Sequence, residues 1–132
     1  MPNYSFDHIH LMVSNPIKAA EFYEKAFGAK RVALTTHANG VTSVALNLAG
    51  TTILIKSTPA SDQRTTDLPQ KRFGLEHWAI RTDDLDMTAK ILKSMGIQFI
   101  QEITKLGPGL RMASIMTQDN VLVEIMEVKP AL

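Results

Sequence analysis

Two histidines and one glutamate have the residue types and spacing of a metal site. His8 and His77 each lie in a segment with the alternation of a strand, and the two are 69 positions apart. Glu124 interrupts an apolar segment, where burial of a carboxylate costs free energy. Metal coordination, ion pairing or solvent exposure would each remove that cost. Two imidazoles and one carboxylate hold a divalent ion with several positions left open. A single strand histidine is more often structural, so the metal hypothesis depends on the combination.

Three further polar residues are candidates for substrate chemistry. His10 lies two residues after the first histidine, about 6.7 Å along the same strand face at roughly 3.3–3.4 Å per residue. It is a candidate proton acceptor, and pocket lining is the alternative. Arg81 shares the strand face of His77, and Arg111 begins a later strand. Either guanidinium could hold a substrate carboxylate or phosphate, and a structural salt bridge is the alternative for each.

The composition excludes several classes of protein. A chain of 132 residues is long enough for one domain, and 45% hydrophobic with 20% charged residues is typical of a soluble folded protein. The net charge of +1 favours neither nucleic acid nor membrane as a partner. The absence of cysteine leaves His, Asp and Glu as the metal ligands. Without a signal-like start or an apolar run of about 18 residues, the expected location is the cytoplasm.

The hydrophobic pattern predicts the same order of elements twice. A first strand is followed in each case by a helix. One helix runs from Pro16 to Phe27 and is capped by Ser14 or Asn15, and the other is capped by Asp83 and Asp84 and ends at Met95. The predicted strands are Phe6 to Val13, Lys30 to Thr36, Val41 to Leu48 and Thr52 to Ser57, then Leu75 to Arg81, Ile97 to Thr104, Arg111 to Thr117 and Val121 to Val128.

Constant offsets indicate an internal repeat. Besides the two histidines, the helix-ending glycines Gly28 and Gly96 are 68 positions apart, and the hairpin glycines Gly40 and Gly109 are 69 apart. Leu54 precedes Glu124 by 70 positions. We therefore expect one α+β domain spanning 1–132, built from two tandem βαβββ units, 5–57 and 74–128, joined by a linker at 58–73.

Three groups of motifs carry a family resemblance. They are His8-Ile9-His10-Leu11-Met12-Val13 with Ala20-Glu21-Phe22-Tyr23 and Phe27-Gly28-Ala29, then Gly74-Leu75-Glu76-His77-Trp78-Ala79-Ile80 with Asp83-Asp84-Leu85-Asp86, and Asp119-Asn120-Val121-Leu122-Val123-Glu124-Ile125. In order and spacing they resemble the vicinal oxygen chelate superfamily, which includes glyoxalase I, methylmalonyl-CoA epimerase, extradiol dioxygenases, fosfomycin-resistance proteins and bleomycin-resistance proteins. The local sequence is most similar to the epimerase and glyoxalase branch.

The resemblance implies a fold and a set of ligands. The fold is a cupped mixed β-sheet with the helices on the outside. By position, His8 and His77 match the family's histidine ligands and Glu124 its last-strand carboxylate, so one divalent ion of Zn, Ni, Co, Mn or Fe is the implied cofactor. Glu124 also matches the base of glyoxalases.

Leu54 departs from the family pattern. Glyoxalase I and the epimerase have a fourth ligand, Glu or Gln, on the last strand of the first unit, and the corresponding position here is a leucine. The remaining set of three ligands is similar to that of extradiol dioxygenases and fosfomycin-resistance proteins. The ligand set and the local sequence therefore point to different branches of the superfamily.

The expected function is that of a metal-dependent lyase or isomerase. Such an enzyme chelates two adjacent oxygens of a small substrate and stabilises an enolate-like intermediate. An Fe(II) extradiol-type dioxygenase and a metal-free binding protein of the bleomycin-resistance kind are the alternatives. The expected partners are a small-molecule substrate and a second copy of the chain in a homodimer.

Overall fold

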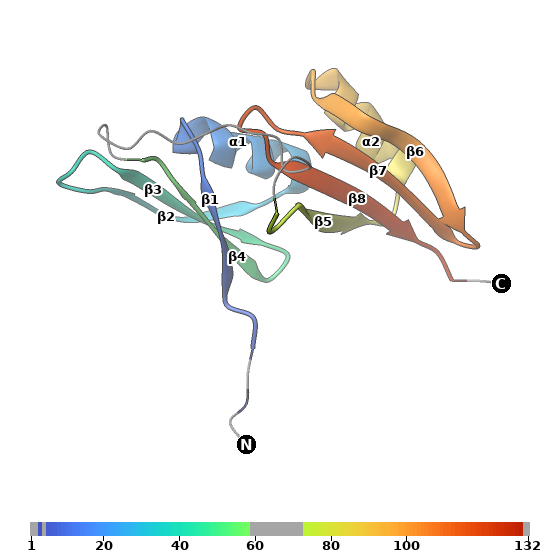
Figure 1. Cartoon of the computed structure of the whole chain (residues 1–132), viewed down its shortest axis with the longest axis horizontal. Helices are drawn as coiled ribbons and strands as arrows, with labels where there is room; N and C mark the ends of the chain where they lie inside the picture. The colour runs from blue at the N-terminus through green and yellow to red at the C-terminus, as the bar shows by residue number, and fades with distance from the viewer. Residues whose placement is uncertain (1–2, 4, 59–72, 131–132) are drawn as a thin grey trace. The chain divides into compact units, whose positions relative to one another are not determined.

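A computed structural model describes residues 3, 5–58 and 73–130. The chain divides into two compact units, Met1–Arg64 and Thr65–Leu132, which are described separately (Figure 1). Neither described helix is long and apolar enough to cross a membrane.

The first unit is one four-stranded sheet with one helix. Its elements are β1 (His8–Met12), α1 (Pro16–Phe27), β2 (Lys30–Thr36), β3 (Thr42–Leu48) and β4 (Thr51–Lys56). The strand order is β1-β4-β3-β2, with β1 parallel to β4 and the other neighbours antiparallel. The first and last strands of the unit are therefore adjacent.

The second unit repeats this topology. Its elements are β5 (His77–Thr82), α2 (Leu85–Ser94), β6 (Gln98–Gly107), β7 (Leu110–Met116) and β8 (Leu122–Val128). The order is β5-β8-β7-β6, again with only the first and last strands parallel. The prediction of two tandem βαβββ units is confirmed.

Local sequence signals set the helix ends. The Asn15 side chain accepts a hydrogen bond from the Lys18 amide at 3.1 Å, and Pro16 occupies the first helical position. Gly28 ends α1 with a φ of 71°, the left-handed conformation that glycine adopts readily. In α2 the Asp84 side chain accepts from the Met87 amide at 2.9 Å. Asn15 and Asp84 are thus the caps among the candidates that the sequence offered.

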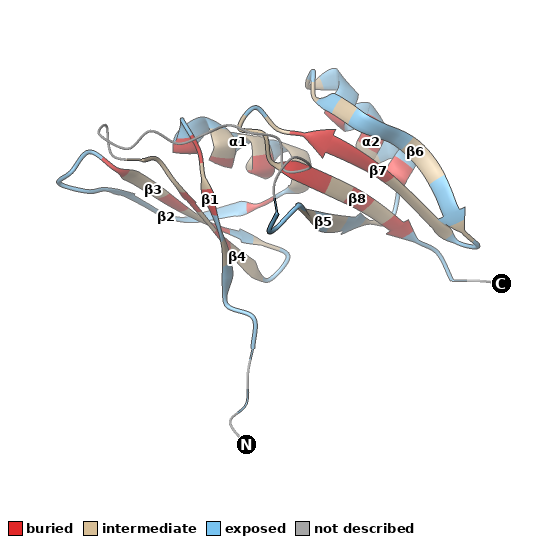
Figure 2. Cartoon of the chain, in the orientation of Figure 1, coloured by how far each residue is buried: buried red, intermediate tan, exposed pale blue. Residues whose placement is uncertain are grey.

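Each sheet buries the face that packs against its own helix (Figure 2). These side chains are within 1% of complete burial: Val44, Leu46, Ile53 and Ile55 in the first sheet, Ala113, Ile115, Val123 and Ile125 in the second, and Ala20, Leu85 and Leu92 on the helices. We call the opposite face of each sheet its far face. Because strand side chains alternate, the residues between the buried ones lie on the far face.

Most predicted boundaries differ from the observed ones by one or two residues. The strand β1 is shorter than the predicted Phe6 to Val13, and β6 continues to Gly107 beyond the predicted end at Thr104. Register shifts within the β6–β7 ladder account for the extra length. Nearly all of the predicted linker, residues 59–72 of 58–73, lies outside the described residues.

Candidate metal centre

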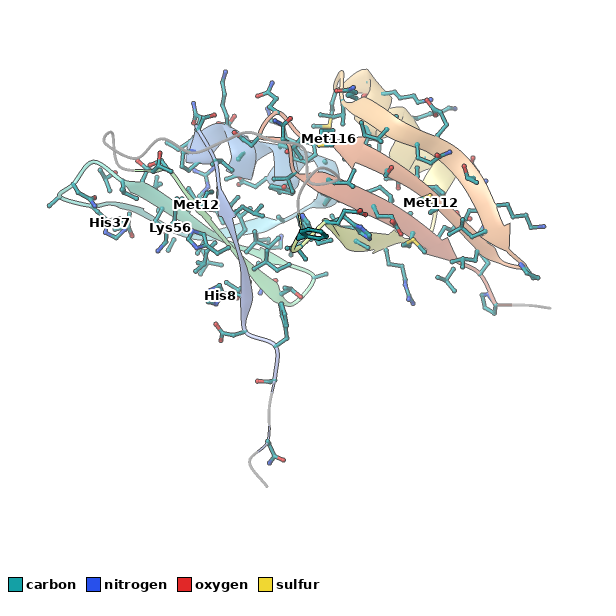
Figure 3. The ribbon with its side chains drawn as sticks, viewed as in Figure 1. His8, Met12, His37, Lys56, Met112 and Met116 are labelled. Carbon is teal, nitrogen blue, oxygen red and sulfur yellow. The ribbon has the colours of Figure 1, made fainter. Side chains whose placement is uncertain are left out.

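The first strands of the two units carry their histidines on the far faces. In β1, Leu11 is buried at 7% exposure, while His8 and His10 on the alternate positions are exposed. Figure 3 shows His8 and Met12 on this strand. The alternation in β5 likewise assigns His77 and Arg81 to the far face of the second sheet.

The structure brings His77 and Glu124 together. They lie on the paired strands β5 and β8, and His77 Nε2 is 3.3 Å from Glu124 Oε2. Their side chains are 35% and 23% exposed, so both donors remain accessible from solvent. In the register, Glu124 lies between Ala79 on β5 and Ser114 on β7. Both neighbours have small side chains.

A carboxylate from the preceding residue contacts the Nδ1 atom of each candidate histidine ligand. Asp7 Oδ2 is 2.6 Å from His8 Nδ1, and Glu76 Oε1 is 3.2 Å from His77 Nδ1. Sequence reasoning missed both acids, although the signal was present: an acidic residue directly precedes each histidine, and Asp7 and Glu76 are 69 positions apart. In each pair, Nε2 is the ring atom left to face a ligand.

The donor set fits a divalent ion in part. An imidazole nitrogen and a carboxylate oxygen converging from neighbouring strands are suitable ligands for borderline metals such as Zn²⁺, Mn²⁺ or Fe²⁺. Within the described ranges, no group of three His, Asp or Glu side chains is assembled as a metal site. His77 and Glu124 are therefore the two candidate ligands that lie together, and His8 belongs to the other unit.

His10 and Leu54 are direct neighbours. The parallel register of β1 and β4 pairs His10 with Leu54, just as that of β5 and β8 pairs Ala79 with Glu124. These are equivalent positions of the repeat. At this pair of positions, the first unit has a titratable side chain on its first strand, and the second unit has one on its last strand.

Arg111 lies on the helix side of the second sheet. Its Nε donates to Glu127 Oε1 at 2.9 Å and its Nη2 donates to Asp86 Oδ2 at 3.0 Å. Glu127 is 3% exposed and also accepts from the Leu85 amide at 2.7 Å. These contacts favour the salt-bridge interpretation of Arg111 over the substrate-binding one. Arg81, in contrast, is exposed on the face of His77.

The same contacts shift three pKa values. The hydrogen bond from the Leu85 amide, with help from Arg111, lowers the pKa of Glu127 against the opposing effect of burial. Arg111 also lowers the pKa of Asp86, and the two carboxylates raise the pKa of the guanidinium. All three groups are therefore charged at neutral pH.

Two further features of the sheets were not singled out from the sequence. Met112 and Met116, labelled in Figure 3, alternate along β7 with the buried Ala113 and Ile115, which assigns them to the far face of the second sheet. In the first sheet, a shallow hollow of about 480 Å³ lies at the end of β4 away from His8. It is lined by His37, Ala38, Asn39, Val41 and Lys56.

Comparison with known proteins gives one family and a set of similar folds. The family model described as Glyoxalase/Bleomycin resistance protein/Dioxygenase superfamily matches residues 5–125. No curated protein matches the chain. A glyoxylase/bleomycin resistance protein/dioxygenase domain from Frankia sp. EAN1pec superposes with a TM-score of 0.79 at 20% identity, covering 97% of this chain and 100% of that one.

Structures of a fosfomycin resistance protein, FosX from Listeria monocytogenes, are also similar. One has a TM-score of 0.76 at 19% identity and covers 97% of this chain and 96% of that one. Another, complexed with Mn(II) and sulfate, has a TM-score of 0.73 at 19% identity with coverage of 97% and 93%. At such identities the similarity establishes a shared fold.

Proposed function

The chain belongs to the Glyoxalase/Bleomycin resistance protein/Dioxygenase superfamily, and on that premise we propose that it is a divalent-metal-dependent lyase or isomerase. Its substrate is a small molecule that offers two neighbouring oxygens. The observation that carries the proposal is the 3.3 Å approach of His77 Nε2 to Glu124 Oε2. A metal-dependent relative of the same fold, FosX, has been solved with Mn(II).

The proposed ligands are His8, His77 and Glu124. The bound ion supplies a positive charge that holds the two substrate oxygens and stabilises negative charge developing on them. His77 and Glu124 contribute an imidazole and a carboxylate from one face of the second sheet. His8 is the equivalent residue of the first unit, and the acid bonded to its Nδ1 matches the arrangement at His77.

Glu124 and His10 are the proposed proton-transfer residues. A carboxylate that binds the ion can also accept a proton from a substrate held beside it. His10 lies beside Leu54, the position equivalent to Glu124, so the imidazole supplies a titratable group where the last strand of the first unit lacks one. This exchange of positions within the repeat supports a chemical role for His10.

Arg81 is the proposed group for an acidic substrate. It lies four residues after His77 on the same strand face, hence about 13 Å away at roughly 3.3 Å per residue. A guanidinium at that separation suits a carboxylate or phosphate at the end of the substrate away from the chelated oxygens. We further propose that the enzyme is a cytoplasmic homodimer.

Metal analysis tests the proposal. The protein is purified without added metal and is then equilibrated with Mn, Fe, Co, Ni or Zn. We expect stoichiometric metal in the wild type and loss of it in His8→Ala, His77→Ala and Glu124→Gln. Glu127→Gln is the matched control because Glu127 lies on the same strand but on the helix side. His37→Ala controls for the loss of a histidine outside the ligand set, and His10→Ala should also retain metal.

The identity of the metal distinguishes the alternatives. Iron alone would favour the Fe(II) extradiol-type dioxygenase, whereas zinc, nickel, cobalt or manganese would favour the lyase or isomerase. If the wild type binds no metal, the enzyme proposal fails and a metal-free binding protein replaces it.

A further inference from the structure

The two carboxylates that precede the candidate ligands form a repeated feature. Asp7 bonds His8 Nδ1 and Glu76 bonds His77 Nδ1, at equivalent positions of two units that share no strand. We propose that Asp7 and Glu76 are positioning residues, which hold each imidazole with Nδ1 protonated and Nε2 presented to the ion. This inference rests on the proposed function, because it assigns residues that act through His8 and His77.

The backbone explains how neighbouring residues can make this contact. Successive side chains in a strand point to opposite faces, so a residue directly before a histidine within a strand cannot reach its ring. Here His8 and His77 are the first residues of β1 and β5, and both acids precede the strands. Each carboxylate can therefore turn to the far face of the sheet, beside the ring that follows it.

Folding stability does not account for these pairs. The side chains of Asp7 and Glu76 are 91% and 57% exposed, and ion pairs in water contribute little to stability. A contact on Nδ1 has a larger effect on metal binding, because it fixes the tautomer and orientation of the ring and makes Nε2 a better donor. Loss of such a partner typically lowers metal affinity about 10- to 100-fold.

The exposure of both acids permits a clean set of variants. Asp7→Asn and Glu76→Gln remove the charge and keep the shape. Glu102→Gln is the matched control. Glu102 is an exposed carboxylate on β6 of the second unit, and its Oε2 is 2.8 Å from Lys93 Nζ. It changes the net charge by the same amount without contacting a candidate ligand.

The experiment measures Mn(II) and Zn(II) affinity by isothermal titration calorimetry at one fixed pH. We expect each single variant to lose about 10- to 100-fold in affinity and the double variant to lose about the product, since the two acids act in separate units. The thermal midpoints of the metal-free variants should match that of Glu102→Gln.

A spectroscopic measurement separates positioning from a change of fold. In ¹⁵N-labelled, zinc-loaded wild type, the Nδ1–H protons of His8 and His77 should give slowly exchanging resonances. Glu76→Ala, which removes the acceptor, should abolish that of His77 and leave that of His8, and Asp7→Ala should do the reverse.

Two results overturn the inference in distinguishable ways. If the wild type binds metal and both variants bind it as tightly as Glu102→Gln, the inference fails and the proposed function stands. If the wild type binds no metal, both fail together.

Discussion

Two glutamates three positions apart on β8 illustrate how strand geometry decides the role of a residue. Glu127 faces α2, is almost fully buried and accepts hydrogen bonds from Leu85 and Arg111. Glu124 lies on the opposite face beside His77, where its partner is an imidazole. The side chains have the same chemistry, but Glu127 joins a helix to a sheet and Glu124 is available for a ligand.

The pKa of Glu127 predicts a contribution to stability that depends on pH. Its folded value lies below the ordinary 4.5, so the stabilisation is complete above 4.5 and is lost as the pH falls through the lowered value. Glu127→Gln should therefore be less stable than the wild type at pH 7, and the difference should shrink between pH 5 and pH 3. Urea unfolding across this range measures it.

A constant difference at all pH values would contradict this linkage.

At the residue scale, the sequence predicted the side chains that lie on regular strands. Alternation alone assigned His8, His10 and Arg81 to one face, and their exposed positions agree with it. The partners of Arg111 were not predictable, because Asp86 and Glu127 are 25 and 16 positions away and only the packing of α2 and the β7–β8 register brings them together.

At the scale of elements, the equivalent hairpins β2–β3 and β6–β7 differ in the space available for a side chain at their glycine. Gly40 and Gly109 both have positive φ, 84° and 67°. A Cβ at Gly40 would meet open space, whereas one at Gly109 would overlap the Lys129 carbonyl oxygen. The amide of Lys129 also donates to the Gly109 carbonyl at 2.7 Å, so the hairpin and the segment after β8 lie in close contact.

This contrast predicts unequal costs for the same substitution. Gly40→Ala should lower the free energy of unfolding by about 1–2 kcal/mol, the cost of the left-handed conformation. Gly109→Ala should cost at least about 1 kcal/mol more, because the backbone must also shift to remove the overlap. Chemical denaturation of both variants gives the comparison, and equal losses would show that the overlap relaxes without cost.

The cap of α1 supports a second prediction about an element. Asn15→Ala removes the acceptor for the Lys18 amide and should cost about 1 kcal/mol of stability. Asn15→Asp keeps the acceptor and should lose much less. Thermal unfolding of the pair tests the cap, and a similar loss in both variants would assign the effect to something other than the hydrogen bond.

The elements were more predictable than their ends. Caps, helix-ending glycines and apolar alternation are local signals, and they placed both helices and every strand. The extension of β6 to Gly107 depends on register shifts against β7, which arise from pairing and leave no local signal.

At the scale of the whole molecule, the proposal requires ligands from both units. Metal at 100 times its dissociation constant should raise the stability of the wild type by about 2.7 kcal/mol, since the folded state alone binds it. Calorimetric melting with and without metal measures this. His77→Ala tests the second unit, and His8→Ala the first.

Loss of the metal-induced shift in both variants is the expected result. A full shift in His8→Ala would restrict the site to the second unit and remove His8 from the ligand set, while leaving His77 and Glu124 in place.

The parallel pairing of first and last strands also has a consequence for folding order. The partners in β1–β4 and β5–β8 are 44 and 45 positions apart, whereas the hairpins pair residues close in sequence. Chain entropy delays such distant contacts, so we expect each unit to form its helix and hairpins before it recruits its first strand. We therefore expect the histidine-bearing strands to be the last to join their sheets and the first to separate. Among the described strands, hydrogen exchange should be fastest there in metal-free protein.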